Sequence, residues 1–390
     1  MKNFNFISPT KIYFGPGKEK EVGAILHENS ASKILIVIGK NSVIKSGLLE
    51  RVVVSLEQYH LSYVILRGVR ANPTFDLVEE GLKLVRDNKL DYILAIGGGS
   101  VIDTAKCIAA NYYYSGNIRD FNLHRAEPKK ALPVGVILTI AAAGSELSNS
   151  CVIQDDKAGI KFGFNSDVIR PVFAIENPEL TYSLPKEQTA YGVVDILMHT
   201  LERYFCKSDK YELADEFAIG LIKNVVELGT LVIQNPDNYD YRASLMLASS
   251  LSHNGITSIG KNMIMPVHQL EHALSGKFPS VAHGLGLAIL FPAWCRIYYK
   301  YDINKFAALG ERVFDIYSGD KTQDALSTID AFEEYFNSLG LPNKLSQIGV
   351  KEEDIDDLVR LVTNNGTRSI YHHTKPINDE VAREIYYSCL

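Results

Sequence analysis

Two short segments in the second half of the chain place ionisable side chains one helical turn apart. In "DILMH", Asp195 stands four residues before His199, and in "HQLEH", His268 stands four residues before His272, so each pair would share one face of a helix. A third segment, "VAHGLGLAI", sets His283 among apolar residues and glycines. These residues could form a binding site, or they could be a wet helix edge and hydrogen-bonded core histidines.

Binding of a divalent metal ion is the chemistry that suits these residue types. An unpaired carboxylate on an apolar face costs on the order of several kcal/mol, so Asp195 needs a cation or hydrogen-bond donors. One aspartate and three neutral histidines are suitable ligands for Zn²⁺ or Fe²⁺. With three or four protein ligands, one coordination position can remain for a substrate oxygen. A single buried histidine is usually a core residue, but the set together favours a metal site.

A glycine-rich turn in the first half of the chain could hold a phosphate. The segment "YILAIGGGSVIDTAKCIAA" is typical of a strand, a turn at Gly97, Gly98 and Gly99, and a helix. We expect Ser100 to cap that helix and Asp103 to complete a capping box. The amides of a helix start suit a pyrophosphate. A tight turn without a ligand is the alternative, and the usual G-x-G-x-x-G spacing is absent.

Polar residues also follow an earlier strand. In "VIGKNSVIKSG", Gly39, Lys40 and Ser42 come at the end of the predicted strand, on the same edge of the sheet as the glycine-rich turn. Lysine and serine at this position could hold an additional phosphate, although a solvated loop lysine is the commoner explanation.

Two domains must position these residues. Continuous apolar runs, "KILIVIG", "YVILRG", "YILAIGGG" and "PVGVILTI", alternate with amphipathic segments and predict a parallel sheet covered on both faces, as in a doubly wound nucleotide-binding domain. From Pro185 on, nearly every segment has a period of 3.6 residues, which predicts helices. We therefore expect a Rossmann-like α/β domain over residues 1–184 and an all-α domain over residues 185–390.

The composition excludes several classes of protein. With 390 residues, 46% hydrophobic, 22% charged and a net charge of −6, the chain resembles ordinary globular proteins and shows no charged arm for nucleic acid or membrane. Five scattered cysteines form neither a zinc-thiolate spacing nor a disulfide framework. No apolar stretch reaches the roughly 20 residues of a membrane helix. We expect a cytoplasmic protein without a targeting signal.

Seven segments together resemble one known family. They run in family order over nearly the whole chain: "KIYFGPGKEKEVG", "GVRANPTFDLVEEG", "AIGGGSVIDTAK", "AAAGSEL", "TAYGVVDILMHTLERYF", "HQLEHALSG" and "AHGLGLAILFPAW". The chain resembles the iron-containing alcohol dehydrogenases, and among them the butanol-dehydrogenase-like branch. The resemblance implies a dehydroquinate-synthase-like architecture, a nicotinamide dinucleotide on the turn at 97–100, and one divalent metal.

The resemblance also implies roles for single residues. The metal ligands would be Asp195, His199, His268 and His283, and His272 would lie beside the substrate. Thr139 and Ser145 would line the cofactor, and Lys161 would lie near its ribose. With the residues of the two turns, the predicted cofactor-binding set is Gly39, Lys40, Ser42, Gly97, Gly98, Gly99, Ser100, Asp103, Thr139, Ser145 and Lys161.

The expected reaction is reversible hydride transfer between NADP(H) and a primary alcohol/aldehyde pair such as butanol/butanal, with Fe²⁺ or Zn²⁺. NAD-preferring relatives carry an aspartate at the position of Gly39, so its absence beside Lys40 and Ser42 favours NADP, with NAD possible. The resemblance implies a homodimer. The alternatives are a polyol dehydrogenase or a dehydroquinate-synthase-like enzyme on the same fold, and a non-catalytic regulator that binds nucleotide and metal.

Overall fold

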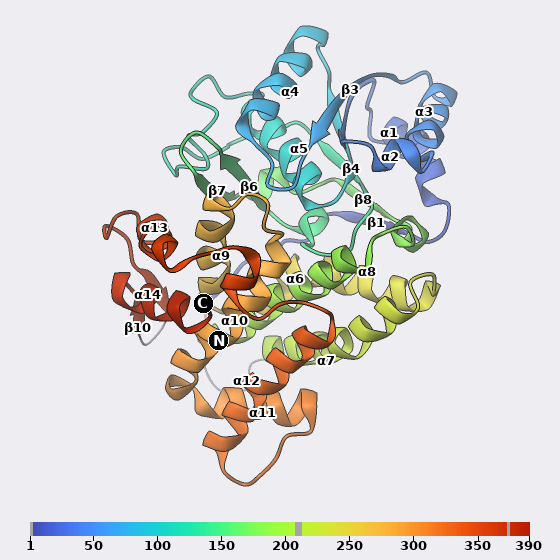
Figure 1. Ribbon diagram of the computed structural model, residues 1–390. Helices are drawn as coiled ribbons and strands as arrows, with labels where there is room; N and C mark the ends of the chain where they lie inside the picture. Colours follow the sequence, from blue (N-terminus) through green and yellow to red (C-terminus); the bar gives the residue numbers. More distant parts are fainter. Residues whose placement is uncertain (1–2, 207–212, 373–374) are drawn as a thin grey trace. The chain divides into compact units, whose positions relative to one another are not determined.

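The computed structural model describes residues 3–206, 213–372 and 375–390 (Figure 1). The chain divides into two compact units. The sheet unit comprises Ile7–Leu184 and Ser249–Asn254, and the helical unit comprises Met1–Phe6, Pro185–Ala248 and Gly255–Leu390.

A parallel sheet forms the centre of the sheet unit. Its six strands lie in the order β1-β8-β5-β4-β2-β3, and every neighbouring pair is parallel. A separate antiparallel hairpin, β6–β7, follows β5. The strands are β1 (Lys11–Phe14), β2 (Lys33–Gly39), β3 (Ser62–Val69), β4 (Tyr92–Gly97), β5 (Val134–Leu138), β6 (Ser150–Asp155), β7 (Ile160–Asn165) and β8 (Phe173–Glu176), and the helices are α1 (Val22–Glu28), α2 (Ser42–Lys45), α3 (Leu48–Gln58), α4 (Phe75–Asn88) and α5 (Gly99–Asn111).

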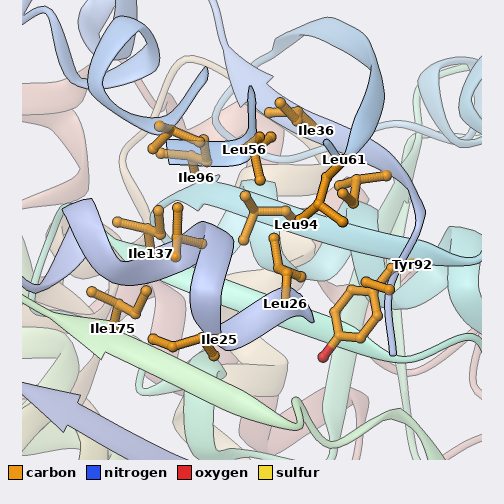
Figure 2. Close-up of a cluster of buried hydrophobic side chains, with 14 of the residues drawn as sticks. Ile25, Leu26, Ile36, Leu56, Leu61, Tyr92, Leu94, Ile96, Ile137 and Ile175 are labelled. Carbon is orange, nitrogen blue, oxygen red and sulfur yellow. The ribbon is translucent and has the colours of Figure 1, made fainter. Parts of the chain in front are cut away.

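Apolar side chains of the strands and of α1, α2 and α3 form a core on one face of this sheet. Figure 2 shows part of it, with labelled residues from α1 (Ile25, Leu26), β2 (Ile36), α3 (Leu56), the following loop (Leu61), β4 (Tyr92, Leu94, Ile96), β5 (Ile137) and β8 (Ile175). Because successive side chains of a strand face opposite sides, Leu35 and Val37 are buried on the other face, which α4 and α5 cover. Both faces are therefore covered, which confirms the predicted α/β fold and explains the continuous apolar runs.

Buried polar side chains of α5 hold the loop after β5 and the β6–β7 hairpin. Lys106 is fully buried, and its Nζ donates hydrogen bonds to the backbone oxygens of Ser145 (2.6 Å) and Ser148 (2.9 Å). The carboxylate of Asp103 accepts hydrogen bonds from Ser145 Oγ (2.6 Å) and from the backbone N–H of Val152 (2.9 Å). The helix after the glycine-rich turn and the loop after β5 are thus fixed to each other.

The helical unit is built almost entirely from helices, as the 3.6-residue period predicted. One departure is the antiparallel hairpin β9–β10, whose three-residue strands are too short to show an alternating pattern. None of the helices among the described residues has both the length and the apolar character needed to cross a lipid bilayer. The elements are α6 (Lys186–Tyr204), α7 (Leu213–Gln234), α8 (Tyr239–His253, whose last five residues belong to the sheet unit), α9 (Pro266–Lys277), α10 (His283–Tyr298), α11 (Ile303–Phe314), α12 (Lys321–Ser338), α13 (Ile355–Val362), β9 (Ile370–His372), β10 (Lys375–Ile377) and α14 (Asp379–Ser388).

Candidate metal centre and nucleotide-binding residues

Three helices of the helical unit bring the predicted metal ligands together. Asp195 and His199 lie one turn apart in the middle of α6, His268 lies in the first turn of α9, and His283 is the first residue of α10. The Nε2 atoms of His199, His268 and His283 lie 3.3, 3.8 and 3.9 Å from Oδ1 of Asp195. The three imidazoles therefore converge on one carboxylate oxygen.

Two glycines after His283 allow these helices to approach each other. A Cβ on Gly284 would lie 2.2 Å from the backbone oxygen of Tyr191 on α6, and a Cβ on Gly286 would lie 2.8 Å from Cγ of Glu271 on α9. A Cβ atom essentially never lies that close to a non-bonded heavy atom, so a larger residue at either position would force α10 or its neighbour to shift. The "HGLG" sequence thus seats the start of α10 against both helices that carry the other ligands.

Two buried glutamates orient the histidines. Nδ1 of His268 is hydrogen-bonded to Glu202 on α6, and Nδ1 of His283 is hydrogen-bonded to Glu271 on α9. An ionised carboxylate can only accept hydrogen bonds, so Nδ1 of each histidine carries a proton. This leaves the Nε2 atoms, which face Asp195, as the atoms that can bind a metal. Glu202 also accepts a hydrogen bond from the backbone N–H of Val267 (2.6 Å), which fixes the start of α9.

The sequence did not single out Glu202 or Glu271. The available signals were weak: Glu202 comes three residues after His199 in "HTLE", and Glu271 stands inside "HQLEH". Their partners belong to other helices, so only the packing of α6, α9 and α10 reveals the contacts.

Two buried atoms of the site have no hydrogen-bond partner among the described residues. They are Oδ1 of Asp195 and Nε2 of His268, whose residues are 5% and 6% exposed. Leaving such atoms unsatisfied in a low-dielectric interior is costly. A divalent cation bound by Asp195, His199, His268 and His283 would satisfy both atoms, so this donor set fits the predicted metal. That these four residues bind it stays a prediction.

The electrostatics of the metal-free site also favour a cation. Burial lowers the pKa of His268, but the carboxylates of Glu202 and Asp195 more than offset this effect and raise the pKa to about 9. At neutral pH, when no metal is bound, the imidazole is therefore protonated on both nitrogens. Its positive charge lies between two carboxylates.

His272 lies beside this site. Its ring centroid is 5.7 Å from that of His283, and its side chain is partly exposed. Glu271, His272 and His283 have possible ligand atoms within 4.8 Å of one another. Because Glu271 already holds Nδ1 of His283, we interpret this second group as the orienting contact of the first site with His272 next to it.

The predicted cofactor-binding residues all lie in the sheet unit. Gly97 ends β4, Gly98 precedes α5, and Gly99 and Ser100 open that helix. The backbone N–H of Thr139 donates to the oxygen of Gly97 (3.2 Å), so the ends of β4 and β5 lie side by side. Lys161, on β7, is buried, and its charge acts on the Asp103 carboxylate.

A second group lies at the end of β2, where the pairing with β3 shifts register. Gly39 is the last residue of the strand, Lys40 is exposed in the following loop, and Ser42 is the exposed first residue of α2. The structure therefore places the two predicted phosphate-binding segments at the carboxyl ends of the neighbouring strands β2 and β4.

Two details of the predicted turn are wrong. Helix α5 begins at Gly99 with Gly98 as its N-cap residue, so Ser100 is a first-turn residue and not the cap. The predicted capping box is also absent, because the Asp103 carboxylate is held by Ser145 and Val152 instead. Asp103 therefore supports the loop after β5, and contact with a cofactor stays a prediction.

Comparison with known proteins decides the family. The models of "Iron-containing alcohol dehydrogenase" and "Fe-containing alcohol dehydrogenase family, C-terminal" match residues 9–178 and 189–389. The chain belongs to the iron-containing alcohol dehydrogenase family. The predicted family is thereby confirmed.

Relatives of this iron-containing alcohol dehydrogenase match over their full length. The NADH-dependent butanol dehydrogenase A of Clostridium acetobutylicum is 36% identical, over 99% of each chain. The NADPH-dependent aldehyde reductase YqhD of Escherichia coli is 33% identical, also over 99% of each chain. Among solved structures, the NADH-dependent butanol dehydrogenase A from Thermotoga maritima superposes with a TM-score of 0.96 at 34% identity, covering 100% of this chain and 99% of that one.

Replacing Gly284 by alanine should weaken metal binding by this dehydrogenase. The added Cβ would meet the backbone of α6 and displace His283 from Asp195. We expect a loss of about tenfold to a hundredfold in Zn²⁺ affinity, measured by competition with a chelator. The control is Gly220→Ala on α7, where a Cβ meets nothing within 4 Å. Equal affinities of the two variants would contradict the close-approach argument.

Metal binding should release the proton of His268. Its pKa of about 9 in the metal-free site means that the imidazole is protonated at neutral pH, whereas a ligand must be neutral. The apparent Zn²⁺ affinity should therefore rise about tenfold per pH unit up to about pH 9 and then level off. Calorimetry in buffers of different ionisation enthalpy counts the released proton. An affinity that does not change between pH 7 and pH 9 would rule out a protonated His268.

Proposed function

We propose that the protein catalyses reversible hydride transfer between NADP(H) and a primary alcohol/aldehyde pair, with butanol/butanal as the model substrates. The observation that carries the proposal is the convergence of three imidazole Nε2 atoms on the buried Oδ1 of Asp195. Membership of the iron-containing alcohol dehydrogenase family and the butanol dehydrogenases among the relatives support the same reaction class.

Each residue has a defined task in this proposal. Asp195, His199, His268 and His283 hold the metal, and Glu202 and Glu271 orient two of the histidines. When bound, the divalent metal supplies a Lewis acid that polarises the substrate oxygen, and the nicotinamide supplies or accepts the hydride. His272 is near enough to the site, and accessible enough to water, to pass the proton between the substrate oxygen and solvent.

The proposed preference for NADP rests on the end of β2. A 2′-phosphate needs cationic or hydroxyl donors, and Lys40 and Ser42 supply them without an aspartate at Gly39. Arg67 on β3 adds a second cation: its Nε donates to the backbone oxygen of Lys40 (2.8 Å) and its Nη2 to Oδ1 of Asn41. An NADH-dependent relative and an NADPH-dependent relative are about equally similar to this chain in sequence. Overall similarity therefore does not decide the cofactor, and the proposed preference rests on these residues.

The proposed organisation follows the predicted boundary. We assign a dinucleotide-binding domain to residues 1–184 and a metal- and substrate-binding domain to residues 185–390. We further propose a cytoplasmic homodimer that binds neither nucleic acid nor membrane. The cytoplasmic location is supported by the five cysteines, which are all buried free thiols.

The test is a panel of straight-chain aldehydes assayed with NADPH and with NADH on protein reloaded with Fe²⁺ or Zn²⁺. We expect NADPH oxidation with butanal, and loss of both metal and turnover in Asp195→Ala and His199→Ala. The control variant is His27→Ala, an exposed histidine of α1 that should leave both unchanged.

Other outcomes would favour other functions. Turnover with glycerol but not with aldehydes would favour a polyol dehydrogenase, and turnover with a sugar phosphate would favour a dehydroquinate-synthase-like enzyme. NADPH binding without turnover at any metal loading would favour a regulator. A strong preference for NADH would refute the argument from Gly39, Lys40 and Arg67.

A further inference from the structure

A buried arginine lies against one of the metal-binding histidines. Arg203 follows His199 by one turn on α6 and is only 1% exposed. Its Nη1 donates to the backbone oxygen of His199 and lies 3.3 Å from Nδ1 of the same residue. Within the described part of the chain, its Nε has no hydrogen-bond partner and its guanidinium makes no ion pair with a carboxylate.

Burying an arginine without an ion-pair partner costs free energy unless negative charge nearby stabilises it. Three buried carboxylates surround the histidines, those of Asp195, Glu202 and Glu271, which are 5%, 2% and 0% exposed. A divalent cation would neutralise two of their three negative charges. The guanidinium of Arg203 supplies one further positive charge, so these three carboxylates, the ion and Arg203 would together carry no net charge.

The arginine also makes His199 different from the other two imidazoles. Nδ1 of His268 and of His283 faces a carboxylate, which strengthens the ligand by accepting a hydrogen bond from Nδ1–H. Nδ1 of His199 faces a group that can only donate. A donor at Nδ1 favours the tautomer with the proton on Nε2, which is the atom that must bind the metal.

Both effects lower the affinity of the site for a metal ion. The positive charge repels a cation at the site, and the donor disfavours the metal-binding tautomer of His199. We infer that Arg203 is a positioning residue that holds metal affinity below what three carboxylates and three histidines would otherwise produce, and so leaves more positive potential for the substrate oxygen. This inference rests on the proposed function of Asp195, His199, His268 and His283 as ligands.

The test compares neutral and charged replacements on the full chain. Zn²⁺ alone is titrated against a chelator, without substrate or nucleotide, for the parent chain, Arg203→Gln, Arg203→Met and Arg203→Lys. We expect about tenfold tighter binding in the two neutral variants and binding close to the parent in Arg203→Lys. The matched control is Arg242→Gln, which should not change Zn²⁺ affinity. Arg242 is a buried arginine of α8 that donates hydrogen bonds to the backbone oxygen of Pro236 and to Oγ1 of Thr189.

A second readout follows the reaction. In the neutral variants, the acidic limb of the pH profile of kcat/KM for butanol oxidation should move to higher pH by about one unit, because less positive charge stabilises the negative charge that develops on the substrate oxygen. Arg203→Lys should keep the profile of the parent chain.

Several results would overturn the inference. Unchanged or weaker Zn²⁺ binding in folded Arg203→Gln or Arg203→Met contradicts the predicted sign. Failure of both neutral variants to fold, when Arg203→Lys folds, would show that the charge serves the fold itself. If the parent chain binds no Zn²⁺ or Fe²⁺, the proposed function fails first. If it binds metal and reduces aldehydes while the variants show no shift, only the inference fails.

Discussion

The buried carboxylate of Asp195 is the constraint on which the helical unit depends. Oδ1 of this carboxylate has no hydrogen-bond partner among the described residues. Such an oxygen is stable in an apolar interior only if a positive charge lies next to it. The imidazoles of His199, His268 and His283 all turn their Nε2 atoms toward it. The starts of α9 and α10 are therefore directed at the middle of α6, and the glycines after His283 make that approach possible.

Three charged side chains near Asp195 each contact a different one of these histidines. Glu202 is hydrogen-bonded to Nδ1 of His268, and Glu271 is hydrogen-bonded to Nδ1 of His283. Arg203 contacts Nδ1 of His199. In the metal-free state the carboxylates of Glu202 and Asp195 raise the pKa of His268 despite its burial, so the protonated imidazole takes part of the role of the cation. Metal binding then exchanges a proton for a divalent ion, so pH and metal availability act on the same site.

Local patterns predicted the elements that carry these residues. The apolar runs of β2, β3, β4 and β5 and the period of α6, α7, α8 and α12 are visible in the sequence, and the spacing of Asp195 and His199 follows from the helix alone. Local patterns failed where partners come from elsewhere. Glu202, Glu271 and Arg203 have their roles because of packing between helices, β1 and β8 are too short to show a pattern, and Ser100 is displaced as a cap by an earlier helix start at Gly99.

The most direct test of the central claim is an anomalous difference map from crystals of the zinc-loaded protein. The account predicts one metal peak, bonded to Asp195 and to Nε2 of His199, His268 and His283 at about 2.0–2.2 Å. A peak held by Glu271, His272 and His283 instead, with Asp195 outside the coordination sphere, would contradict it.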